Sequence, residues 1–373
     1  MAEITVRTDG GEYPVHIGRE IVERKLAADI ARLRPHRVVV VSHPPIYDLH
    51  GKRLYAALQG GMGGAAKINE FLFPQGEESK NLKTLEDGYC ALLEFGITRE
   101  DLLLAFGGGV VGDLAGFLAA TFVRGMPYIQ VPTTLMAMVD SSIGGKVGID
   151  LQGAKNAVGA FHQPLAVCGD ASFLSTLPER ELRSGLAEVA KYGFLYDREL
   201  LRATEDFKRG LPGEAYDLTE IISTCAGHKA RVVGMDEYDI TGERAMLNYG
   251  HTFGHALESA CGYGRLRHGE AVAAGMIMAA RLSELIGLCE EGLCAYHQQV
   301  LMPILGEGAR NIDVERERLI SDMQSDKKRG ESLRFVLLEG LQEPRLVEAV
   351  AMREVESAVE ETLETLRRAD PCL

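Results

Sequence analysis

The sequence is poor in positive charge. Its 40 lysine and arginine residues are outnumbered by 54 aspartate and glutamate residues, which gives a formal net charge of −14. Nucleic acids and anionic membranes are bound through a positive field over the whole contact surface, so the composition argues against both as partners. An anionic small molecule needs only a local group of cations. We therefore expect any such substrate to be bound in a basic pocket.

The sequence also lacks the segments that direct a chain to or across a membrane. No run approaches the ~18 uninterrupted apolar residues of a spanning helix, and residues 1–4 have neither the basic nor the apolar region of a signal peptide. Its seven cysteines, an odd number scattered along the chain, are typical of reduced thiols and not of a disulfide framework. We expect a cytoplasmic protein with no membrane partner.

What the sequence does contain is length and glycine. A chain of 373 residues exceeds the size at which one hydrophobic core usually keeps growing, so two domains are expected. Its 42 glycines follow no collagen-like period and favour an α/β enzyme with many tight turns. In the first half, short β-branched runs alternate with helical patterns, and the clearest strands are residues 38–41, 102–106 and 128–131. This alternation predicts a parallel sheet covered by helices.

The second half has a different pattern. Beyond about residue 178 the apolar residues recur with helical spacing over long segments, namely 187–195, 247–259 and 270–286. The acidic stretch 347–370 is expected to form a solvated terminal helix. The sequence therefore predicts an α/β domain over residues 1–177 and an all-α domain over residues 178–373.

A glycine-rich segment, GGGVVGD at residues 107–113, follows the strand 102–106 and precedes a helical segment. Glycines at such a turn allow backbone N–H groups and a helix N-terminus to face a pyrophosphate. The spacing differs from the usual GxGxxG dinucleotide pattern, so a plain strand-to-helix turn fits the segment equally well. Two further clusters, residues 77–80 and 132–134, add hydroxyls, a cation and a carboxylate where loops follow strands.

Histidines and one glutamate suggest a metal site. His251 and His255 are four residues apart and so share one face of a helix, and His268 precedes another helix start. Glu188 lies among apolar residues, with Lys191 three positions later on the same helix face. Taken alone, these are as well explained by surface or core histidines and an ordinary ion pair. Together, two histidines and a glutamate make a plausible open zinc site.

Several cations lie on apolar or glycine-rich backgrounds: Arg124, Lys146, Lys155, Lys229, Arg244, Lys327 and Lys328. Each alone is more typical of a solvated surface residue. In so acidic a chain, their joint presence beside the metal candidates indicates a pocket for a phosphorylated carboxylic acid.

Six long motifs, taken together, resemble the 3-dehydroquinate synthase family of sugar-phosphate cyclases. They are GGGVVGDLAGF (107–117), RGMPYIQVPTT (124–134), VDSSIGGKVGID (139–150), KNAVGAFHQP (155–164), ERELRSGLAEVAKYG (179–193) and LNYGHTFGHALE (247–258). The resemblance runs in order from about residue 77 to residue 338. It implies a Rossmann-like NAD-binding α/β domain, an all-α metal-binding domain and an active site between them in a homodimer. The implied reaction converts 3-deoxy-D-arabino-heptulosonate 7-phosphate into 3-dehydroquinate and phosphate.

The resemblance also implies roles for single residues. Zinc or cobalt would be held by Glu188, His251 and His268, whereas His255 would contact the substrate phosphate or relay a proton. The residues implied to contact NAD are Glu77, Lys80, Gly108, Gly109, Asp113, Thr133, Thr134, Lys155, Phe173, Leu174, Ser175 and Thr176. Those implied to meet the substrate are Asp140, Lys146, Asn156, Lys191, Lys229, Arg244, Asn248, His255 and Lys328, with Arg124 reaching the neighbouring subunit's site. Whether Lys327 or Lys328 faces the pocket stays open.

The chain departs from the family pattern in two places. After the strand 38–41, where the family usually has an aspartate for the adenosine ribose, this chain has Ser42 and His43, with Asp48 further on. Residues 236–244 are about one residue longer than usual, and Asp239 stands where a glutamate is common.

Other functions fit parts of the pattern. Cyclases that make 2-deoxy-scyllo-inosose or valiolone-type products act on substrates without a carboxylate, so Lys229 and Arg244 argue against them. No residue of the sequence distinguishes a cyclase for aminodehydroquinate from one for dehydroquinate. A glycerol-dehydrogenase-like alcohol dehydrogenase would show net NADH production, and a non-catalytic scaffold paralogue would have lost charged pocket residues.

Overall fold

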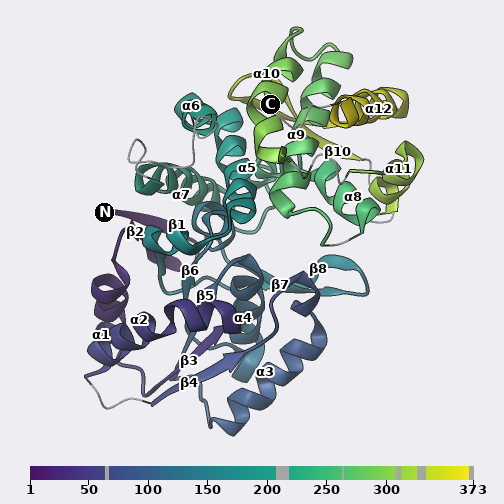
Figure 1. Cartoon of the computed structure of the whole chain (residues 1–373). Helices are drawn as coiled ribbons and strands as arrows, with labels where there is room; N and C mark the ends of the chain where they lie inside the picture. Colours follow the sequence, from purple (N-terminus) through teal and green to yellow (C-terminus); the bar gives the residue numbers. More distant parts are fainter. Residues whose placement is uncertain are drawn as a thin grey trace. The chain divides into compact units, whose positions relative to one another are not determined.

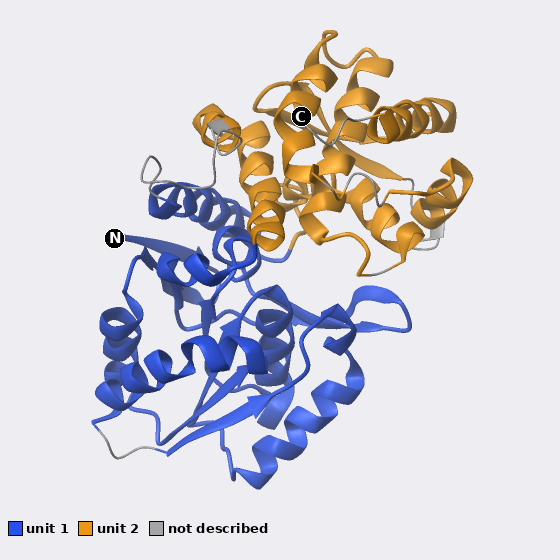
Figure 2. Cartoon of the chain, in the orientation of Figure 1, with its two compact units in different colours: residues 1–178, 218–238 blue, residues 179–217, 239–373 orange. Residues whose placement is uncertain are grey.

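The computed structural model describes residues 1–63, 67–206, 218–262, 264–306, 308, 312–325 and 333–368. It divides into two compact units (Figure 2). Unit 1 comprises residues 1–178 and 218–238, and unit 2 comprises residues 179–217 and 239–373. A single division after residue 177 was expected, but helix α7 (Leu218–Met235) belongs to unit 1, where it packs against β1.

Unit 1 is built on a seven-stranded sheet with the order β1-β2-β9-β6-β5-β3-β4 (Figure 1). Its strands are β1 (Ala2–Thr8), β2 (Gly11–Gly18), β3 (Arg37–Ser42), β4 (Lys67–Leu72), β5 (Leu102–Gly107), β6 (Tyr128–Pro132) and β9 (Val167–Asp170). β1 and β2 pair antiparallel, and every other neighbouring pair is parallel. The parallel sheet predicted from the alternating pattern is therefore confirmed.

The other helices of unit 1 are α1 (Ala27–Leu33), α2 (Pro44–Met62), α3 (Leu82–Glu94) and α4 (Gly109–Thr121), with short turns η1 (Val22–Leu26), η2 (Glu77–Ser79), η3 (Phe122–Arg124), η4 (Ala137–Ser141) and η5 (Ala171–Thr176). Local chemistry begins two of them. α2 starts with prolines, which suit the first helical turn because their missing N–H has no partner there. The side chain of Asn81 caps α3 by accepting a hydrogen bond from the Thr84 N–H at 3.0 Å.

The core of unit 1 positions the edge of the sheet where a ligand is expected to bind. Side chains of β3 and β5, such as Val39 and Leu103, pack with Leu114 and Leu118 of α4 and are fully buried. A separate antiparallel hairpin, β7 (Lys146–Leu151) with β8 (Ala154–Phe161), packs on α4. The carboxyl ends of β5 and β6 therefore lie beside the start of α4, the edge at which open parallel sheets collect ligands.

Unit 2 is mainly helical. Its elements are α5 (Glu179–Leu195), α6 (Arg198–Asp206), η7 (Arg244–Asn248), α8 (His251–Cys261), α9 (His268–Leu285), α10 (Leu293–Leu305), α11 (Arg316–Ser325), β10 (Arg334–Gly340), β11 (Glu343–Glu348) and α12 (Met352–Arg368). α9 is buried along most of its length, and α5, α8, α10 and α12 pack around it.

Two details of unit 2 differ from the expectation of a purely helical domain. β10 and β11 form an antiparallel hairpin that packs on α9. Periodicity cannot distinguish a strand from a buried helix in so short an apolar run as residues 335–338. The terminal helix begins at Met352 and not near residue 347, and one of its faces is buried through residues such as Val355 and Leu363. Within the described part of the chain, no helix has the length and apolar character that crossing a bilayer requires.

Candidate metal centre and cofactor site

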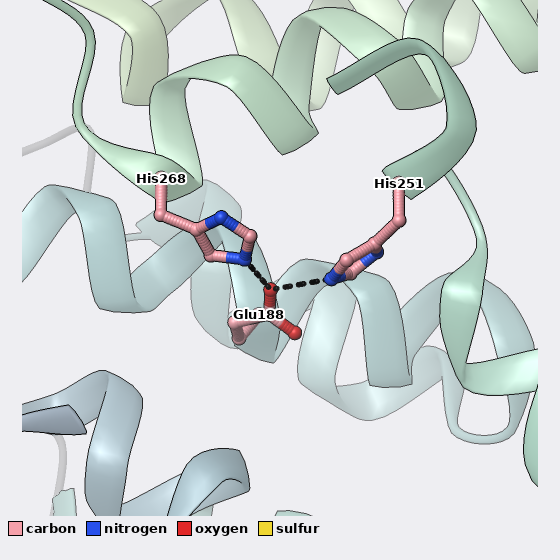
Figure 3. A group of neighbouring side chains, drawn as sticks. All are labelled: Glu188, His251 and His268. Carbon is pink, nitrogen blue, oxygen red and sulfur yellow. Dashed lines mark ion pairs between the residues drawn. The ribbon is translucent and has the colours of Figure 1, made fainter. Parts of the chain in front are cut away.

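Glu188, His251 and His268 converge in unit 2, although they come from three different helices (Figure 3). Nε2 of each histidine lies 3.7 Å from Oε1 of Glu188. One ligand atom from each residue can be chosen so that all three lie within 4.8 Å of one another. Bonds of about 2.0–2.2 Å to a tetrahedral ion would place neighbouring ligand atoms about 3.4 Å apart, so the spacing suits one small cation.

Close helix packing sets these separations. The N–H of Gly269 donates to Oγ of Ser184 at 3.0 Å, and a Cβ on Gly269 would lie 1.9 Å from the Ser184 carbonyl oxygen. A Cβ on Gly275 would lie 2.1 Å from the carbonyl oxygen of Gly250. Only glycine therefore allows α9 to approach both α5, which carries Glu188, and the start of α8, which carries His251.

The two histidines present Nε2 to the glutamate because their other ring nitrogen is engaged. Nδ1 of His251 lies 3.2 Å from the carbonyl oxygen of Tyr249, and Nδ1 of His268 lies 3.5 Å from Oε2 of Glu258. Both partners are acceptors, so in each ring Nδ1 carries the proton and Nε2 keeps its lone pair. Burial, aided by the charge of Lys191, holds the pKa of His251 well below its usual value, which favours the neutral ring that a metal requires.

The donor set fits a divalent cation. Glu188 is 1% exposed, and its Oε1 accepts no hydrogen bond from any described residue. Nζ of Lys191 lies 2.5 Å from Oε2, the carboxylate oxygen next to the one that the histidines approach. An unsatisfied buried oxygen facing two imidazole lone pairs is unfavourable without a positive ion between them. Two histidines and one carboxylate are also an open zinc ligand set with room for substrate oxygens.

Among the other expected substrate residues of unit 2, His255 lies beside the metal ligands, and Arg244 and Asn248 lie in η7. The His255 ring is 5.5 Å from that of His251 and 6.0 Å from that of His268, and with Glu258 and His268 it forms a second possible ligand group. Arg244 is buried in η7, which packs against α5, and Asn248 is exposed at the end of η7. Lys327 and Lys328 lie outside the described residues.

In unit 1, Lys80 joins two residues expected to contact NAD, Glu77 and Asp113, to Asn156, which was expected to meet the substrate. Its Nζ lies 2.8 Å from Glu77 Oε1, 3.3 Å from Asp113 Oδ2 and 2.7 Å from Asn156 Oδ1. Asp150, which the sequence analysis did not select, lies 3.6 Å from Nζ and also accepts from the Asn156 N–H at 2.8 Å. We call these five residues the Lys80 cluster. Asp150 follows the apolar residues 147–149 near the end of β7, a weak signal that could have identified it.

Burial and neighbouring charges shift the pKa values of the Lys80 cluster. Burial opposes the charge of Lys80, but Asp113, Glu77 and Asp150 outweigh it and raise the lysine pKa. Burial raises the pKa of Asp113 to about 6, although Lys80 favours its ionised form. The pKa of Asp150 is also raised, chiefly by burial. The cluster thus holds three carboxylates around one central cation, with Nζ of Lys155 4.0 Å from Glu77 at its edge.

The glycine-rich segment lies at the carboxyl end of β5, with Gly108 as the N-cap of α4. The Thr133 N–H donates to the Gly107 carbonyl at 2.9 Å, and a Cβ on Gly108 would lie 3.0 Å from Cγ2 of Thr134. Gly109 begins the helix, whose first N–H groups can face an anion. The structure therefore brings the predicted Gly108, Gly109, Thr133 and Thr134 to one edge of the sheet.

The loop expected to contact NAD after β9 forms η5. Phe173 and Leu174 are buried and Ser175 and Thr176 are exposed, with Thr176 Oγ1 2.8 Å from Nε2 of His50. Near the expected ribose position, Ser42 donates to the Phe106 carbonyl at 2.6 Å.

His43 is buried beside Phe73, with its Nδ1 3.0 Å from the Phe73 carbonyl, and burial lowers its pKa. The residues at the end of β3 are therefore engaged inside the protein, and Asp48 is exposed on α2.

The remaining expected substrate residues of unit 1 lie on α7, η4, β7 and η3. Nζ of Lys229 on α7 lies 2.9 Å from Oδ1 of Asp140 in η4. Lys146 is exposed at the start of β7. Arg124 is exposed at the end of η3, in the left-handed region with φ +67°.

Comparison with known proteins identifies the family. The family model for the 3-dehydroquinate synthase N-terminal region matches residues 70–184, and that for the C-terminal region matches residues 185–329. A 3-dehydroquinate synthase of Pelobacter propionicus is 45% identical over 89% of this chain and 89% of its own length.

Among solved structures, a 2-deoxy-scyllo-inosose synthase complexed with carbaglucose-6-phosphate, NAD⁺ and Co²⁺ has a TM-score of 0.84 and 27% identity over 96% of this chain and all of its own. A 2-epi-5-epi-valiolone synthase from Streptomyces hygroscopicus subsp. jinggangensis, with NAD⁺ and Zn²⁺ bound, has a TM-score of 0.80 and 25% identity over 95% and 97% of the two chains. By these matches, the chain belongs to the 3-dehydroquinate synthase family.

Proposed function

We propose that this chain converts 3-deoxy-D-arabino-heptulosonate 7-phosphate into 3-dehydroquinate and phosphate, with NAD and a zinc or cobalt ion as cofactors. The convergence of Glu188, His251 and His268 carries the proposal, because these residues would hold a Lewis acid that makes a sugar hydroxyl more acidic and so eases hydride transfer from its carbon. The 45% identity to a 3-dehydroquinate synthase over most of the chain supports this substrate.

The two cofactors supply a Lewis acid at the substrate hydroxyls and a reversible hydride acceptor. Glu188, His251 and His268 would hold the ion, and Lys191 would offset the charge of the glutamate through its contact with Oε2. Gly108, Gly109 and the N-terminus of α4 would face the pyrophosphate of NAD, with Thr133 and Thr134 beside it. The two solved relatives with NAD and Co²⁺ or Zn²⁺ bound support this assignment.

The chain's cations are assigned to the anionic groups of the substrate. Lys229 and Arg244 would bind the carboxylate and so fix the ring orientation for closure of the carbocycle. Lys146, Asn156, His255, Lys328 and the neighbouring subunit's Arg124 would hold the phosphate while it leaves, and Asp140 and Asn248 would bind hydroxyls. Because Arg124 would serve a neighbour, we further propose a homodimer, acting in the cytoplasm.

The test is phosphate release from the heptulosonate phosphate by the purified protein, with and without chelator and with and without NAD. We expect release only when metal and NAD are both present, and no lasting change at 340 nm, because NAD would be regenerated in each turnover. No release under replete conditions would contradict the proposal. Net NADH formation from simple polyols would point to an alcohol dehydrogenase, and turnover of the amino analogue alone to an aminodehydroquinate synthase.

A further inference from the structure

Two buried polar side chains of unit 2, Tyr249 and His297, have no role in the proposed reaction. Both are 0% exposed, and the Tyr249 hydroxyl lies 2.8 Å from Nε2 of His297. Buried polar groups are tolerated in an apolar core only when they are hydrogen-bonded. The Tyr249 hydroxyl and Nε2 of His297 therefore satisfy each other's need for a hydrogen bond.

The direction of this hydrogen bond follows from the other side of the imidazole. Nδ1 of His297 lies 2.8 Å from the carbonyl oxygen of Leu293, which can only accept, so Nδ1 carries the proton. Nε2 is then an acceptor, and the tyrosine hydroxyl donates to it. Burial lowers the pKa of His297 to about 4, which keeps the ring neutral. Phe194 stacks on the imidazole at 3.7 Å between ring centroids, so the ring is held on α10 in one orientation.

Tyr249 links this ring to the metal cluster through its own backbone. It follows η7 directly and precedes Gly250, whose φ of +78° forms the sharp corner at the start of α8. The Tyr249 carbonyl accepts from Nδ1 of His251 at 3.2 Å. Rotating that peptide unit away from His251 would strain the anchored side chain, since Tyr249 Cα is shared by both.

We propose that Tyr249 and His297 are positioning residues for the metal centre. Their hydrogen bond holds the Tyr249 carbonyl in place, and the carbonyl holds His251 in the tautomer and orientation that present Nε2 to the ion. The inference rests on the proposed metal-dependent function. Loss of an outer-shell partner of a metal ligand typically reduces metal affinity 10- to 100-fold. Because Tyr249 and His297 act through one further bond, we expect a loss of about tenfold.

The experiment uses the full chain stripped of metal and titrated with Co²⁺ against a chromophoric chelator, with the visible absorption spectrum of bound Co²⁺ recorded in parallel. The variants are Tyr249→Phe, His297→Phe, their combination, and His297→Gln, whose amide can accept from the tyrosine and donate to the Leu293 carbonyl. The matched control is Tyr128→Phe, another fully buried tyrosine, whose hydroxyl donates to the His162 carbonyl in unit 1 at 2.9 Å.

We expect Tyr249→Phe and His297→Phe each to weaken Co²⁺ binding about tenfold and to shift the Co²⁺ spectrum, with the double variant no worse than either single one. His297→Gln should restore most of the affinity, and Tyr128→Phe should change neither readout. If Tyr249→Phe does not fold, the two His297 variants decide: equal affinities for them would overturn the inference. Wild-type protein that binds Co²⁺, with variants that bind it equally well, overturns this inference alone. Failure of the wild type to bind Co²⁺ overturns the metal centre itself.

Discussion

Unit 1 gathers half-buried carboxylates around a lysine, whereas unit 2 buries Glu188 beside two histidines and places its lysine at the side. In the Lys80 cluster, one ammonium group lies within 3.6 Å of carboxylate oxygens from Glu77, Asp113 and Asp150. In unit 2, the lysine is at the side: Nζ of Lys191 lies 2.5 Å from Oε2 of Glu188, and Nε2 of His251 and of His268 each lies 3.7 Å from Oε1. Unit 1 thus places its own cation among its carboxylates, whereas in unit 2 the oxygen that faces the histidines has a place for a cation from solution.

The two clusters also differ in how their side chains are held in position. Lys80 is a long side chain at the end of the 3₁₀ turn η2, and its partners come from that turn, from α4 and from the β7–β8 hairpin. The unit 2 ligands sit on rigid helices whose separation is set by backbone contacts at Gly269 and Gly275. A metal tolerates little error in ligand distance, and rigid elements place ligands more accurately than loops. The comparison teaches that a charge cluster can be adjusted by a flexible lysine, whereas a metal site must be built into the packing.

The strongest way to break this comparison is Glu188→Gln, which keeps the shape of the side chain but removes its charge. We expect loss of bound metal and a fall in turnover of about 10³-fold, since a Lewis acid contributes several kcal/mol to such a transition state, here about 4 kcal/mol. Metal content after dialysis and phosphate release measure both. Alanine at His251 should act likewise. The exposed Glu199→Gln is the control, and full metal content in Glu188→Gln would remove this residue from the ligand set.

The corresponding change in unit 1 is Lys80→Met, which leaves three carboxylates without their central cation. Breaking a buried charge pair is expected to destabilise the protein by about 3 kcal/mol and to weaken NAD binding. Urea unfolding and calorimetric NAD titration test this, with metal content expected to stay unchanged. Lys83→Met, which changes an exposed lysine paired with Glu86 and Asp87 on α3, is the matched control. Loss of metal in Lys80→Met would show that the two clusters are not independent.

The packing side of the comparison is tested by Gly269→Ala. A Cβ at 1.9 Å from the Ser184 carbonyl must push α9 away from α5, and overpacking of this kind costs about 2 kcal/mol. Because Glu188 and His268 separate in the process, metal affinity should fall as well. Gly227→Ala on α7, where a Cβ meets nothing within 4 Å, should instead be neutral or slightly stabilising. Thermal unfolding and Co²⁺ titration distinguish the two, and equal behaviour would contradict the packing argument.

The smallest expected effect concerns pH and the raised pKa of Asp113. The pKa of Asp113 is about 6 in the folded protein and near the ordinary 3.8 in the unfolded chain. Between these two pH values, the folded protein keeps a proton that the unfolded chain has released. The contribution of this group is therefore fully present below pH 3.8 and is lost as the pH rises through 6. Since the side chain is 20% exposed and Lys80 favours its ionised form, we expect about 1 kcal/mol.

Asp113→Asn, compared with wild type in urea unfolding from pH 4 to pH 7, isolates this term. The stability of the variant relative to the wild type should rise across that range, because the wild type alone bears the loss. A difference that is constant with pH would show that Asp113 titrates at its ordinary value in the folded protein.

Much of the fold followed from local patterns. The strands at 38–41, 102–106 and 128–131 were visible because β-branched runs ended at glycines or polar residues, and α5, α8 and α9 because their apolar residues recur with helical spacing. The hairpin β10–β11 was missed because its apolar run is too short to show a period. The place of α7 in unit 1 was missed because its contacts with β1 join residues more than 200 positions apart.

The candidate sites divide in the same way. Histidines, glycines and isolated cations can be recognised by residue type, so the candidate ligands could be predicted from the sequence. Asp150, Tyr249, Ser184 and His297 could not, because nothing in their neighbourhood along the chain distinguishes them from ordinary core or strand residues. Their roles arise from contacts with Lys80, His251, Gly269 and Tyr249 that only the folded chain creates.

By itself, then, the sequence determined which chemical groups this protein has, the alternation of strands and helices in its first half, the mainly helical pattern of its second half, and its family. Tertiary structure decided which of those groups meet, which ring nitrogen faces the expected ion, and which carboxylate is compensated by a lysine. The physical reason is that residue chemistry and backbone periodicity are local properties, whereas distance, burial and protonation depend on what distant segments bring alongside.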